Sequence, residues 1–493
     1  MIRGTRSSGP AHLPEYLVTR IRFGTDGWRA EIGRGFTFEN LRSVAQAICD
    51  ITRADGAELA VVAYDRRFLA RRAAQEVVGV LLGNGFQVRL SDRAEPTPAL
   101  SCQVVESGAQ LGIALTASHN PAEFLGLKIK TAAGASAPPE LTEQVEREIG
   151  RSPVRALAPS RGIALGRLEI GSFAPAHLAR LRRVVDLDAL RRARLRIAFD
   201  AMHGAAGPVL DDLLGDATVE VVTLRGERDP LFGGQAPEPT RDRLGPLLEA
   251  AGGGGFSFGF ATDGDGDRIA AVDEHGEFVS PLRLVGVLAL HLTRRRQVPG
   301  GLAKTFANTV YLDRIAAAEG RPFHCLPVGF KHIAALLLRG EIAIGGEESG
   351  GIGFAGYLPE RDGVLAGLLL LEAVAESGTT LAGLVAALAA EFGELHYDRI
   401  DLHGPAEHWS RALAHLREQP PEHVAGIRVT GVDPLDGLKL LLGEEGWLLL
   451  RASGTEPVLR IYAETRTPQA VAALLGAGKD LVSASQPAAT STG

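Results

Sequence analysis

Short apolar runs that end in a polar, glycine- or proline-bearing turn recur along this chain and constrain its fold most strongly. Leu111 to Leu115 runs into residues 116–121 (Thr-Ala-Ser-His-Asn-Pro), and Ile342 to Ile344 runs into residues 345–351 (Gly-Gly-Glu-Glu-Ser-Gly-Gly). A third run, Leu195 to Phe199, behaves in the same way. Each run is long enough for a buried strand, and helical periodicity flanks these runs. The order predicts α/β domains with mostly parallel sheets and helices on both faces.

The length of the chain predicts several domains. Its 493 residues are too many for one hydrophobic core, so we expect three or four domains with room for a cleft between them. From Glu394 onward the expected strands, such as Trp447 to Leu450, become shorter, which is typical of an α+β domain. The predicted divisions are a flexible arm over residues 1–18, related α/β domains over 19–185, 186–297 and 298–395, a smaller α+β domain over 396–482, and a disordered tail over 483–493.

The composition favours a cytoplasmic protein that binds neither nucleic acid nor membrane. A formal net charge of −7 argues against anionic partners of either kind. The three cysteines, Cys49, Cys102 and Cys325, have no metal-type spacing and indicate a reducing compartment. The longest apolar stretch, Val364 to Leu371, is far short of the roughly 20 residues that a membrane-spanning helix needs. Residues 2–10 show no apolar signal region.

The turn at residues 116–121 is the first candidate for chemistry. Ser118 stands between small and polar residues, beside His119, and Pro121 prevents simple continuation of a helix or strand. This pattern predicts a rigidly held hydroxyl. Taken alone, the turn is better explained as a strand-to-helix connection that uses Ser and Asn as caps.

A second loop carries three aspartates, Asp263, Asp265 and Asp267, separated by glycines and followed by Arg268. Two carboxylates about 4 Å apart repel by about 4 kcal/mol at an effective dielectric constant near 20. A bound cation would offset this repulsion. An oxygen-only ligand set suits Mg²⁺, with a phosphate oxygen completing the shell. An EF-hand is excluded because Arg268 stands where its loop needs glycine. A solvated acidic turn is the structural alternative.

Two further loops fit a phosphorylated sugar. Carboxylate and hydroxyl groups on the loop with Glu347 and Ser349 can accept and donate hydrogen bonds to sugar hydroxyls, although a plain hairpin turn is an equal alternative. Arg451 begins an Arg-Ala-Ser-Gly-Thr-Glu-Pro segment over residues 451–457, whose donors suit a phosphate group. No Walker A sequence is present, so nucleotide binding is poorly supported.

Together the loops resemble those of the α-D-phosphohexomutase family, which includes phosphoglucomutase and phosphomannomutase. The matching segments follow the family's order: residues 23–29, 116–121, 263–268, 346–350 with 361–363, and 451–457. The resemblance implies a heart-shaped enzyme of four domains, each of which contributes one loop to a central cleft. It also implies a phosphosugar substrate, Mg²⁺, and a sugar 1,6-bisphosphate as primer and intermediate.

The resemblance also implies roles for individual residues. Ser118 would be the phosphoserine, and its phosphate would share Mg²⁺ with Asp263, Asp265 and Asp267. The catalytic set would further include His119, Lys128 and Arg29, although a lysine needs a lowered pKa to take up protons, and Lys128 can also be explained as a surface lysine on a strand. The substrate-binding set would be Arg268, Lys331, Glu347, Ser349, Arg451, Ser453, Gly454, Thr455 and Arg460.

The expected reaction interconverts a hexose 1-phosphate and a hexose 6-phosphate, most simply those of glucose. A phosphomannomutase, a dual-specificity enzyme, or a sugar-phosphate-binding protein without activity are the alternatives. Two positions depart from the family pattern: Leu125 stands where many members have asparagine, and Gly351 where many have histidine. Both bear on which sugar is bound more than on the reaction type. We expect a monomer or a weak homodimer.

Overall fold

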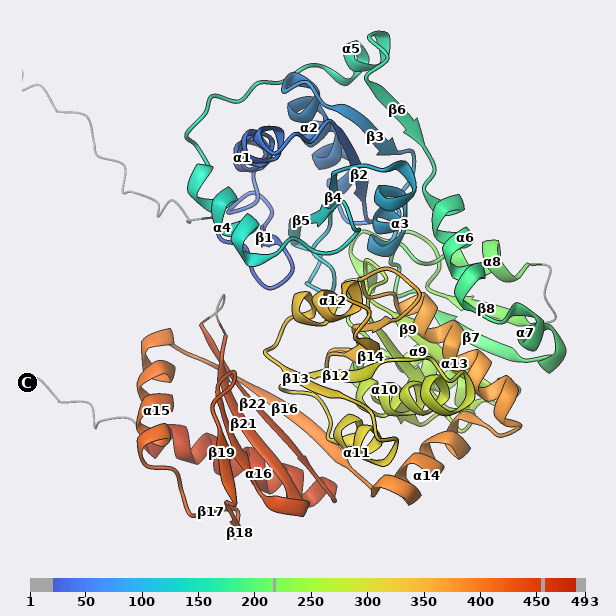
Figure 1. Cartoon of the computed structure of the whole chain (residues 1–493), viewed down its shortest axis with the longest axis vertical. Coiled ribbons are helices and arrows are strands. Elements are labelled where there is room, and N and C mark those ends of the chain that lie inside the picture. Colours follow the sequence, from blue (N-terminus) through green and yellow to red (C-terminus); the bar gives the residue numbers. More distant parts are fainter. Residues whose placement is uncertain (1–20, 216–218, 454–456, 485–493) are drawn as a thin grey trace, which may run out of the picture.

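The computed structural model describes residues 21–215, 219–453 and 457–484, which form four successive units (Figure 1). The predicted arm over residues 1–18 and residues 485–493 of the predicted tail lie outside these ranges. Residues 483–484 of that tail belong to the last helix, α16 (Pro468–Ala484). In the described part of the chain no single helix is long and apolar enough to cross a membrane; α13 (Gly363–Ser377) and α14 (Leu381–Phe392) pass that test only together, with an 83° bend between them.

The first unit is a six-stranded mixed sheet in the order β1-β5-β4-β2-β3-β6. Strands β2, β3, β4 and β6 are parallel, whereas β5 runs antiparallel to both β4 and β1. The elements are β1 (Trp28–Glu31), α1 (Phe38–Ala54), β2 (Leu59–Tyr64), α2 (Ala70–Gly83), β3 (Gln87–Ser91), α3 (Thr97–Ser107), β4 (Leu111–Leu115), β5 (Phe124–Thr131), α4 (Pro139–Glu148), α5 (Pro159–Ala164) and β6 (Leu168–Gly171). Thr37 caps α1 by accepting a hydrogen bond from the backbone N–H of Asn40.

The second unit has a five-stranded sheet in the order β11-β10-β9-β7-β8. Strands β7, β8 and β9 are parallel, and β10 turns back antiparallel to β9. The elements are α6 (Ala174–Val184), α7 (Leu187–Ala193), β7 (Arg196–Asp200), α8 (Val209–Leu214), β8 (Glu220–Leu224), α9 (Gly245–Gly252), β9 (Phe258–Thr262), β10 (Ile269–Val272) and β11 (Phe278–Val279). The sheet therefore combines a parallel centre with an antiparallel flank.

The third unit repeats this plan with four strands in the order β13-β12-β14-β15. Only the β14–β15 pair is antiparallel. The elements are α10 (Pro281–Leu290), a π-helical turn (His291–Arg295), β12 (Gly301–Thr305), α11 (Tyr311–Ala318), β13 (Phe323–Leu326), α12 (Phe330–Leu338), β14 (Ile342–Gly346), β15 (Ile352–Phe354), α13 and α14. One hydrophobic core runs through the second and third units, from Phe199 and Phe260 to Leu302 and Leu368.

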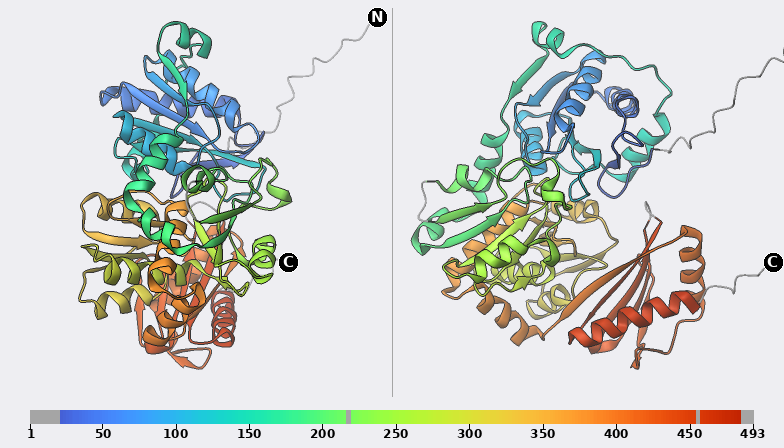
Figure 2. Two further views of the ribbon diagram at one scale, coloured as in Figure 1. Left: turned by 90° about the vertical axis from the view of Figure 1, so that its right-hand side faces the viewer. Right: turned by 180° about the vertical axis from the view of Figure 1, so that it is seen from behind.

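The fourth unit is an antiparallel sheet in the order β16-β22-β21-β20-β19, with α15 (Ala406–Glu418) and α16 packed on it. Figure 2 shows α16 lying along the sheet. The strands are β16 (His396–His403), β17 (His423–Val424), β18 (Ile427–Arg428), β19 (Gly431–Asp433), β20 (Leu438–Leu441), β21 (Gly446–Ala452) and β22 (Val458–Thr465). This unit has a hydrophobic core of its own. The fourth unit thus has the α+β architecture that the sequence predicts from Glu394 onward.

An aromatic contact joins the third and fourth units. Phe306 packs with Trp447 and Tyr462 in one buried cluster. The Nζ atom of Lys439 lies inside this contact, 3.8 Å from the centre of the Trp447 ring, and donates a hydrogen bond of 2.8 Å to the carbonyl of Phe306. Burial lowers the pKa of Lys439 to about 7, and the nearby Lys304 adds to the effect. Protonation of Lys439 in this interface therefore lowers the free energy of unfolding.

We predict that Lys439→Met changes how stability depends on pH. Because the pKa of Lys439 is lower in the folded state than in the unfolded chain, the unfolded chain binds more protons between about pH 7 and 10, and the contribution of Lys439 to stability rises with pH in that window. The variant lacks this rise, so its unfolding midpoint relative to the wild type should be highest near pH 7 and fall toward pH 10. Thermal melts followed by tryptophan fluorescence measure this. An offset that does not change with pH would contradict the lowered pKa.

Candidate active site

The serine loop is the connection between β4 and β5. Ser118 is buried and has a positive φ of 52°, a left-handed conformation that few residues other than glycine adopt. Its backbone N–H donates to the Thr116 hydroxyl at 2.8 Å, and that hydroxyl donates to Asp65 at 2.6 Å. The strand before the loop was predicted with its observed bounds, but the loop leads into an antiparallel strand rather than a helix. This return strand brings Lys128 back beside Ala114.

Arg67 fixes the shape of the serine loop, and the sequence reasoning missed it. Its guanidinium donates to the carbonyl oxygens of Ser118 at 2.6 Å, Asn120 at 2.5 Å, Pro121 at 2.7 Å and Phe124 at 3.2 Å. The planar arginine fork is suited to holding several acceptors at once. The only signal in the sequence was the Asp-Arg-Arg segment directly after β2, at the same sheet edge as the serine loop. We interpret Arg67 as the residue that holds Ser118 in its uncommon backbone conformation.

The aspartate loop connects β9 and β10 and meets the serine loop across the domain boundary. The carboxylate of Asp263 accepts a hydrogen bond of 2.7 Å from Oγ of Ser118. Gly264 allows this approach, because a Cβ atom there would lie 2.5 Å from the carbonyl oxygen of Ser118. Asp263, Asp265 and Asp267 are fully buried, and one oxygen from each lies within 4.8 Å of the others. The predicted meeting of these loops is therefore present in the structure.

The donor set of this loop fits a divalent cation. Burial, together with the neighbouring Asp267 and Asp265, raises the pKa of Asp263 well above its usual value. Within the described residues, Oδ1 of Asp265 and Oδ1 of Asp267 are buried without a hydrogen-bond donor. Carboxylate oxygens in that condition are costly unless a cation or donor reaches them. The three aspartates thus match the oxygen ligands that Mg²⁺ prefers.

Lys128 lies among carboxylates rather than on the surface. Its Nζ atom is 2.8 Å from carboxylate oxygens of Asp26, Asp265 and Asp267. Although burial alone would lower the pKa of Lys128, these three negative charges outweigh burial and raise it above its usual value. The lowered pKa that proton uptake requires is therefore not found in this state of the site. The surface-lysine interpretation is wrong, because the side chain is almost fully buried.

The other predicted catalytic residues surround the serine loop. Arg29 donates to the side-chain oxygen of Asn120 at 2.9 Å. Burial, together with Arg268 and Arg29, holds the pKa of His119 well below its usual value, so its imidazole is neutral. Arg268 donates its backbone N–H to Asp263 at 3.2 Å and its guanidinium lies 3.4 Å from Glu238. The structure therefore places Arg29 against the serine loop that carries His119, and Arg268 against Asp263.

The sugar loop between β14 and β15 contributes Glu347 and Ser349. Glu347 is buried, and burial raises its pKa to about 7 even though Arg361 binds its carboxylate at 3.0 Å. The same guanidinium binds Asp267 at 2.7 Å and also contacts Asp26. Ser349 is half-buried on the following turn. Arg361 was part of the recognised pattern, but it received no role from the sequence.

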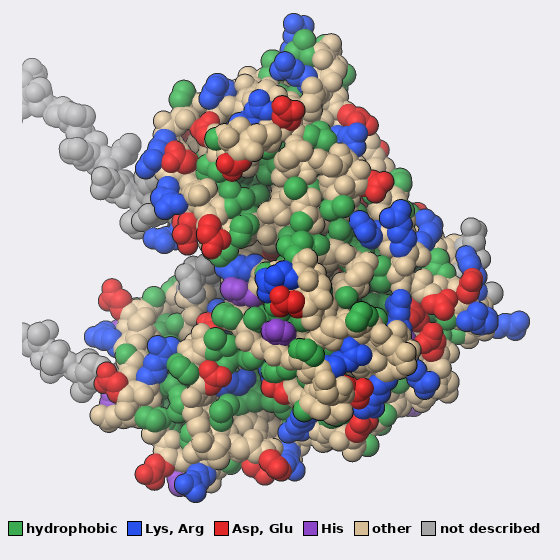
Figure 3. All heavy atoms as spheres, viewed as in Figure 1, with side chains coloured by type: hydrophobic (Ala, Val, Ile, Leu, Met, Phe, Trp, Pro, Cys, Tyr) green, Lys and Arg blue, Asp and Glu red, His purple; other side chains and the backbone are tan. Residues whose placement is uncertain are grey.

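The predicted phosphate-binding residues lie farther along the chain, on α12, β21 and β22. Lys331, at the start of α12, lines a small hollow of about 20 Å³ together with Asp26 and Ser136 of the first unit. Arg451 donates to Asp436 at 3.0 Å, and Arg460 lies 3.6 Å from Asp401. Ser453 ends the described part of this segment, and Gly454 and Thr455 lie outside the described residues. In Figure 3 the molecule is hollowed between the first and fourth units, with Lys, Arg and His side chains at the inner end of the hollow.

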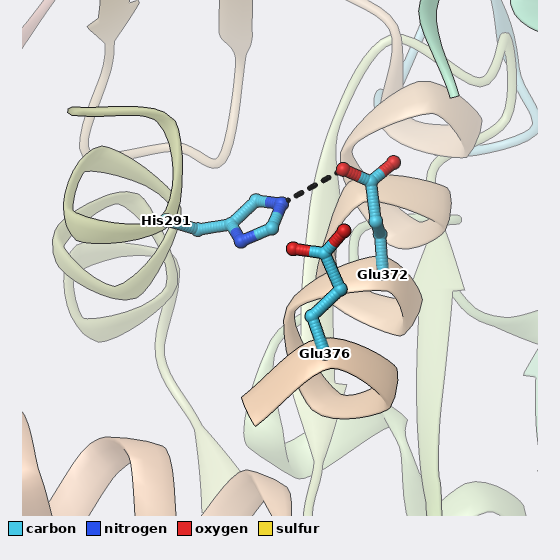
Figure 4. A group of neighbouring side chains, drawn as sticks. All are labelled: His291, Glu372 and Glu376. Carbon is cyan, nitrogen blue, oxygen red and sulfur yellow. Dashed lines mark hydrogen bonds and ion pairs between the residues drawn. The ribbon is translucent and has the colours of Figure 1, made fainter. Parts of the chain in front are cut away.

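A second group of potential metal ligands lies apart from the active site, between α13 and the π-helical turn that follows α10. Figure 4 shows Nε2 of His291 pointing at Glu372, 3.0 Å from its carboxylate, with Glu376 one turn farther along the helix. Glu372 also accepts the backbone N–H of Asp186 at 2.8 Å and lies 3.5 Å from the guanidinium of Arg296. The carboxylate of Glu372 is therefore already paired with hydrogen-bond donors and a cation of the protein. We interpret the group as a structural contact.

Comparison with known families agrees with the geometry of the four loops. Models of the phosphoglucomutase/phosphomannomutase family match all four units: alpha/beta/alpha domain I over residues 20–154, domain II over 175–276, domain III over 281–392, and the C-terminal domain over 417–477. The chain belongs to the phosphoglucomutase/phosphomannomutase family. Its members are enzymes that transfer phosphate within sugar phosphates. The predicted family, enzyme class and four-domain α/β architecture are confirmed, whereas the heart shape stays a prediction.

Individual relatives carry different substrate names. The chain is 28% identical over 449 residues to a phosphoglucomutase/phosphomannomutase of Thermococcus kodakarensis, which covers 91% of this chain and 95% of the relative. It is 31% identical over 477 residues to a phosphoglucosamine mutase of Frankia casuarinae, covering 92% and 96%. A solved structure from Thermus thermophilus with the provisional name phosphomannomutase is 37% identical, has a TM-score of 0.84, and covers 95% of this chain and 100% of that one.

We predict that a divalent cation stabilises the protein through the aspartate loop. Mn²⁺ at 100 times its dissociation constant should add about 2.7 kcal/mol to the unfolding free energy, seen as a higher thermal midpoint. Asp263→Asn should lose this increase, while its metal-free midpoint should be no lower than that of the wild type, because the amide has nearly the same shape and removes one of three mutually repelling charges. The control variant Glu376→Gln, in the second group, should keep the full increase. An increase lost in the control alone would place the metal there instead.

Proposed function

We propose that the protein is a Mg²⁺-dependent phosphosugar mutase that interconverts glucose 1-phosphate and glucose 6-phosphate through a phosphorylated Ser118. The observation that carries this proposal is the 2.7 Å contact between the Ser118 hydroxyl and Asp263 in a loop of three buried aspartates. A hydroxyl in a binding protein has no need of such a setting. A phosphate on that oxygen brings roughly −1.5 to −2 charge to the carboxylates, which calls for a cation.

The aspartate loop would hold that cation through Asp263, Asp265 and Asp267. A bound Mg²⁺ supplies charge neutralisation and polarises the phosphoryl oxygens. The chain itself contributes further positive charge, because Arg29 contacts Asn120 of the serine loop and Arg268 belongs to the aspartate loop. Preorganised positive groups of this kind stabilise a loose phosphoryl-transfer transition state. We assign Arg29 and Arg268 this role.

The transfer step moves one phosphoryl group between two oxygens. The bond from phosphorus to Oγ of Ser118 breaks as a bond to the attacking sugar oxygen forms, and the sugar hydroxyl loses its proton. In the reverse direction the leaving sugar oxygen takes up a proton. We assign the proton transfer to Lys128, which the hairpin β4–β5 places in the same site. This assignment requires that the negative charge of the carboxylates that raise its pKa be offset in the working enzyme, as a cation bound to the aspartate loop would do. His119 supports the serine loop.

The remaining loops would hold the sugar and the phosphate that is not reacting. Glu347 and Ser349 would bind sugar hydroxyls, since a carboxylate can accept from two neighbouring hydroxyl groups. Lys331, Arg451, Ser453, Gly454, Thr455 and Arg460 would bind the distal phosphate. Because such a clamp binds either end of a sugar 1,6-bisphosphate, the intermediate can turn over and return its other phosphate to Ser118. The product is the positional isomer.

Glucose is the first choice of sugar, and the relatives name the alternatives. Phosphomannomutase activity, alone or together with phosphoglucomutase activity, is the second candidate, because both names occur among relatives that span nearly the whole chain. The phosphoglucosamine mutase relative adds glucosamine phosphate to the panel. The glutamate-bearing loop favours glucose or mannose phosphates over glucosamine phosphate only weakly.

We predict that Ser118→Ala abolishes turnover while the fold stays intact. Phosphoryl transfer to bulk water or to another side chain lacks the positioned hydroxyl, so the loss should exceed about a thousandfold, as for other removed nucleophiles. Coupled assays with glucose, mannose and glucosamine 1-phosphates, primed with the matching bisphosphate, measure turnover and rank the sugars. Intact-protein mass spectrometry should find one phosphoryl group on the wild type and none on the variant.

The control is Ser107→Ala, which alters a half-buried serine at the end of α3 and outside the site, and which should keep activity and phosphorylation. A Ser118→Ala enzyme that still turns over would show that another group accepts the phosphate. A wild type that binds hexose phosphates tightly, yet neither takes up phosphate nor turns over, would favour the sugar-phosphate-binding alternative.

A further inference from the structure

The guanidinium of Arg361 joins loops from three of the four domains. One nitrogen binds Glu347 of the sugar loop at 3.0 Å. Another binds Asp267 of the aspartate loop at 2.7 Å and contacts Asp26, in the glycine-rich turn before β1. The side chain is 4% exposed, and its charge lies 5.3 Å from the centre of the Phe330 ring. Contacting three carboxylates in this way requires the planar guanidinium with its several N–H donors, and a lysine ammonium does not reproduce that geometry.

Gly351 provides the space that the arginine occupies. A Cβ atom at this position would lie 2.3 Å from Cδ of Arg361 and 3.0 Å from the bound carboxylate oxygen of Glu347. Even the smallest other side chain would therefore push the guanidinium off the carboxylate. Gly351 has no unusual φ, and its carbonyl accepts the backbone N–H of Glu347 at 2.9 Å. The need for glycine here comes from the close approach and not from the backbone conformation.

The backbone on both sides of Arg361 is held from other elements. Glu360 forms a buried ion pair with Lys130 of β5. Asp362 caps α13 through the N–H groups of Val364 and Leu365, and its other oxygen accepts from Tyr357 at 2.7 Å and contacts His177 of α6 at 2.7 Å. The arginine is thus anchored at its base as well as at its tip, which is what a side chain that orients another group requires.

We infer that Arg361 is the positioning residue that presents Glu347 to the sugar and links the sugar loop to the aspartate loop, and that Gly351 exists to admit it. The inference rests on the proposed role of Glu347 in sugar binding. Arg361 uses only Oε2 of Glu347, and Oε1 accepts no hydrogen bond from the described residues. A sugar hydroxyl can therefore use Oε1 while the arginine fixes the plane of the carboxylate.

The test compares four variants by their affinity for glucose 1-phosphate. Arg361→Met removes the charge with a similar chain length, and Glu347→Gln removes its partner. Each should raise KM about tenfold, because a charge-assisted hydrogen bond is lost, with a smaller change in kcat. Arg361→Lys keeps the positive charge but not the planar guanidinium, so its KM should rise less than that of Arg361→Met. Gly351→Ala, which leaves every charge in place, should raise KM in the same direction.

The double variant Arg361→Met/Glu347→Gln decides whether the arginine acts through the glutamate. If it does, the double variant should bind no worse than the poorer single variant, because the second change has nothing further to remove. Adding Gly351→Ala to Arg361→Met should likewise have little effect. Fully additive losses in KM would overturn the inference, and so would a Gly351→Ala protein with wild-type KM. The matched control is Gly476→Ala in α16, where a Cβ atom meets nothing within 4 Å.

Calorimetric titration with glucose 1-phosphate gives the same comparison without turnover. A wild type that binds the sugar phosphate but does not isomerise it would remove the proposed mutase activity and still allow the binding comparison. If the wild type isomerises glucose 1-phosphate and the Arg361 and Gly351 variants bind this sugar phosphate as tightly as the wild type, the inference is wrong and the proposed mutase activity stands. Should Arg361→Met fail to fold, Gly351→Ala and Arg361→Lys carry the test.

Discussion

Three buried carboxylates that repel one another are the constraint on which the rest of this structure depends. Asp263, Asp265 and Asp267 are fully removed from solvent in one short loop, and charges buried in this way must be matched by positive charge or by protons. Among the described residues, side chains from other parts of the chain supply some of this positive charge. Lys128 comes from the first domain and Arg361 from the third, and both bind Asp267. Balancing one loop thus ties three domains together.

The domains meet through backbone as well as through charge, and glycines make this possible. A Cβ atom on Gly363 would lie 2.2 Å from the carbonyl oxygen of Arg268, and one on Gly350 would lie 2.3 Å from that of Ile269. The sugar loop and the start of α13 therefore rest directly on the strand that follows the aspartates. Close contact of this kind leaves little freedom between the second and third domains, and their shared hydrophobic core agrees with that. The first domain joins the same site through Ser118 of the serine loop and through Lys128 of β5.

The sequence predicted local structure where apolar runs end abruptly at polar turns. The strand at Leu111–Leu115 has the predicted bounds, because polar residues close this run. The same signal located the serine, aspartate and sugar loops. It did not show that the serine loop leads into an antiparallel return strand, since such a strand has no distinctive pattern at this length. A hairpin at the sugar loop was one of the two alternatives that it left open. Leu125, one of the two departures from the family pattern, proved to be a fully buried core residue of such a return strand.

What the sequence did not predict are the contacts between loops far apart in the chain. Arg67 reaches three carbonyl groups of the serine loop and that of Phe124 only in the folded chain, and the Asp-Arg-Arg segment was its only signal in the sequence. The raised pKa of Lys128 likewise follows from carboxylates that converge from two loops. The second departure, Gly351, was expected to bear on sugar contacts. The structure adds that it gives Arg361 room beside Glu347.

The central claim is that Ser118 and the three aspartates share one divalent ion, and phosphorus NMR of the phosphorylated protein tests it most directly. With Mg²⁺ the phosphoserine signal should be sharp. Replacing Mg²⁺ by paramagnetic Mn²⁺ should broaden that signal beyond detection, because the ion and the phosphorus are neighbours, and Asp265→Asn should restore it. A phosphoserine signal that stays sharp while Mn²⁺ is bound to the wild type would place the ion and Ser118 in separate sites and contradict the account.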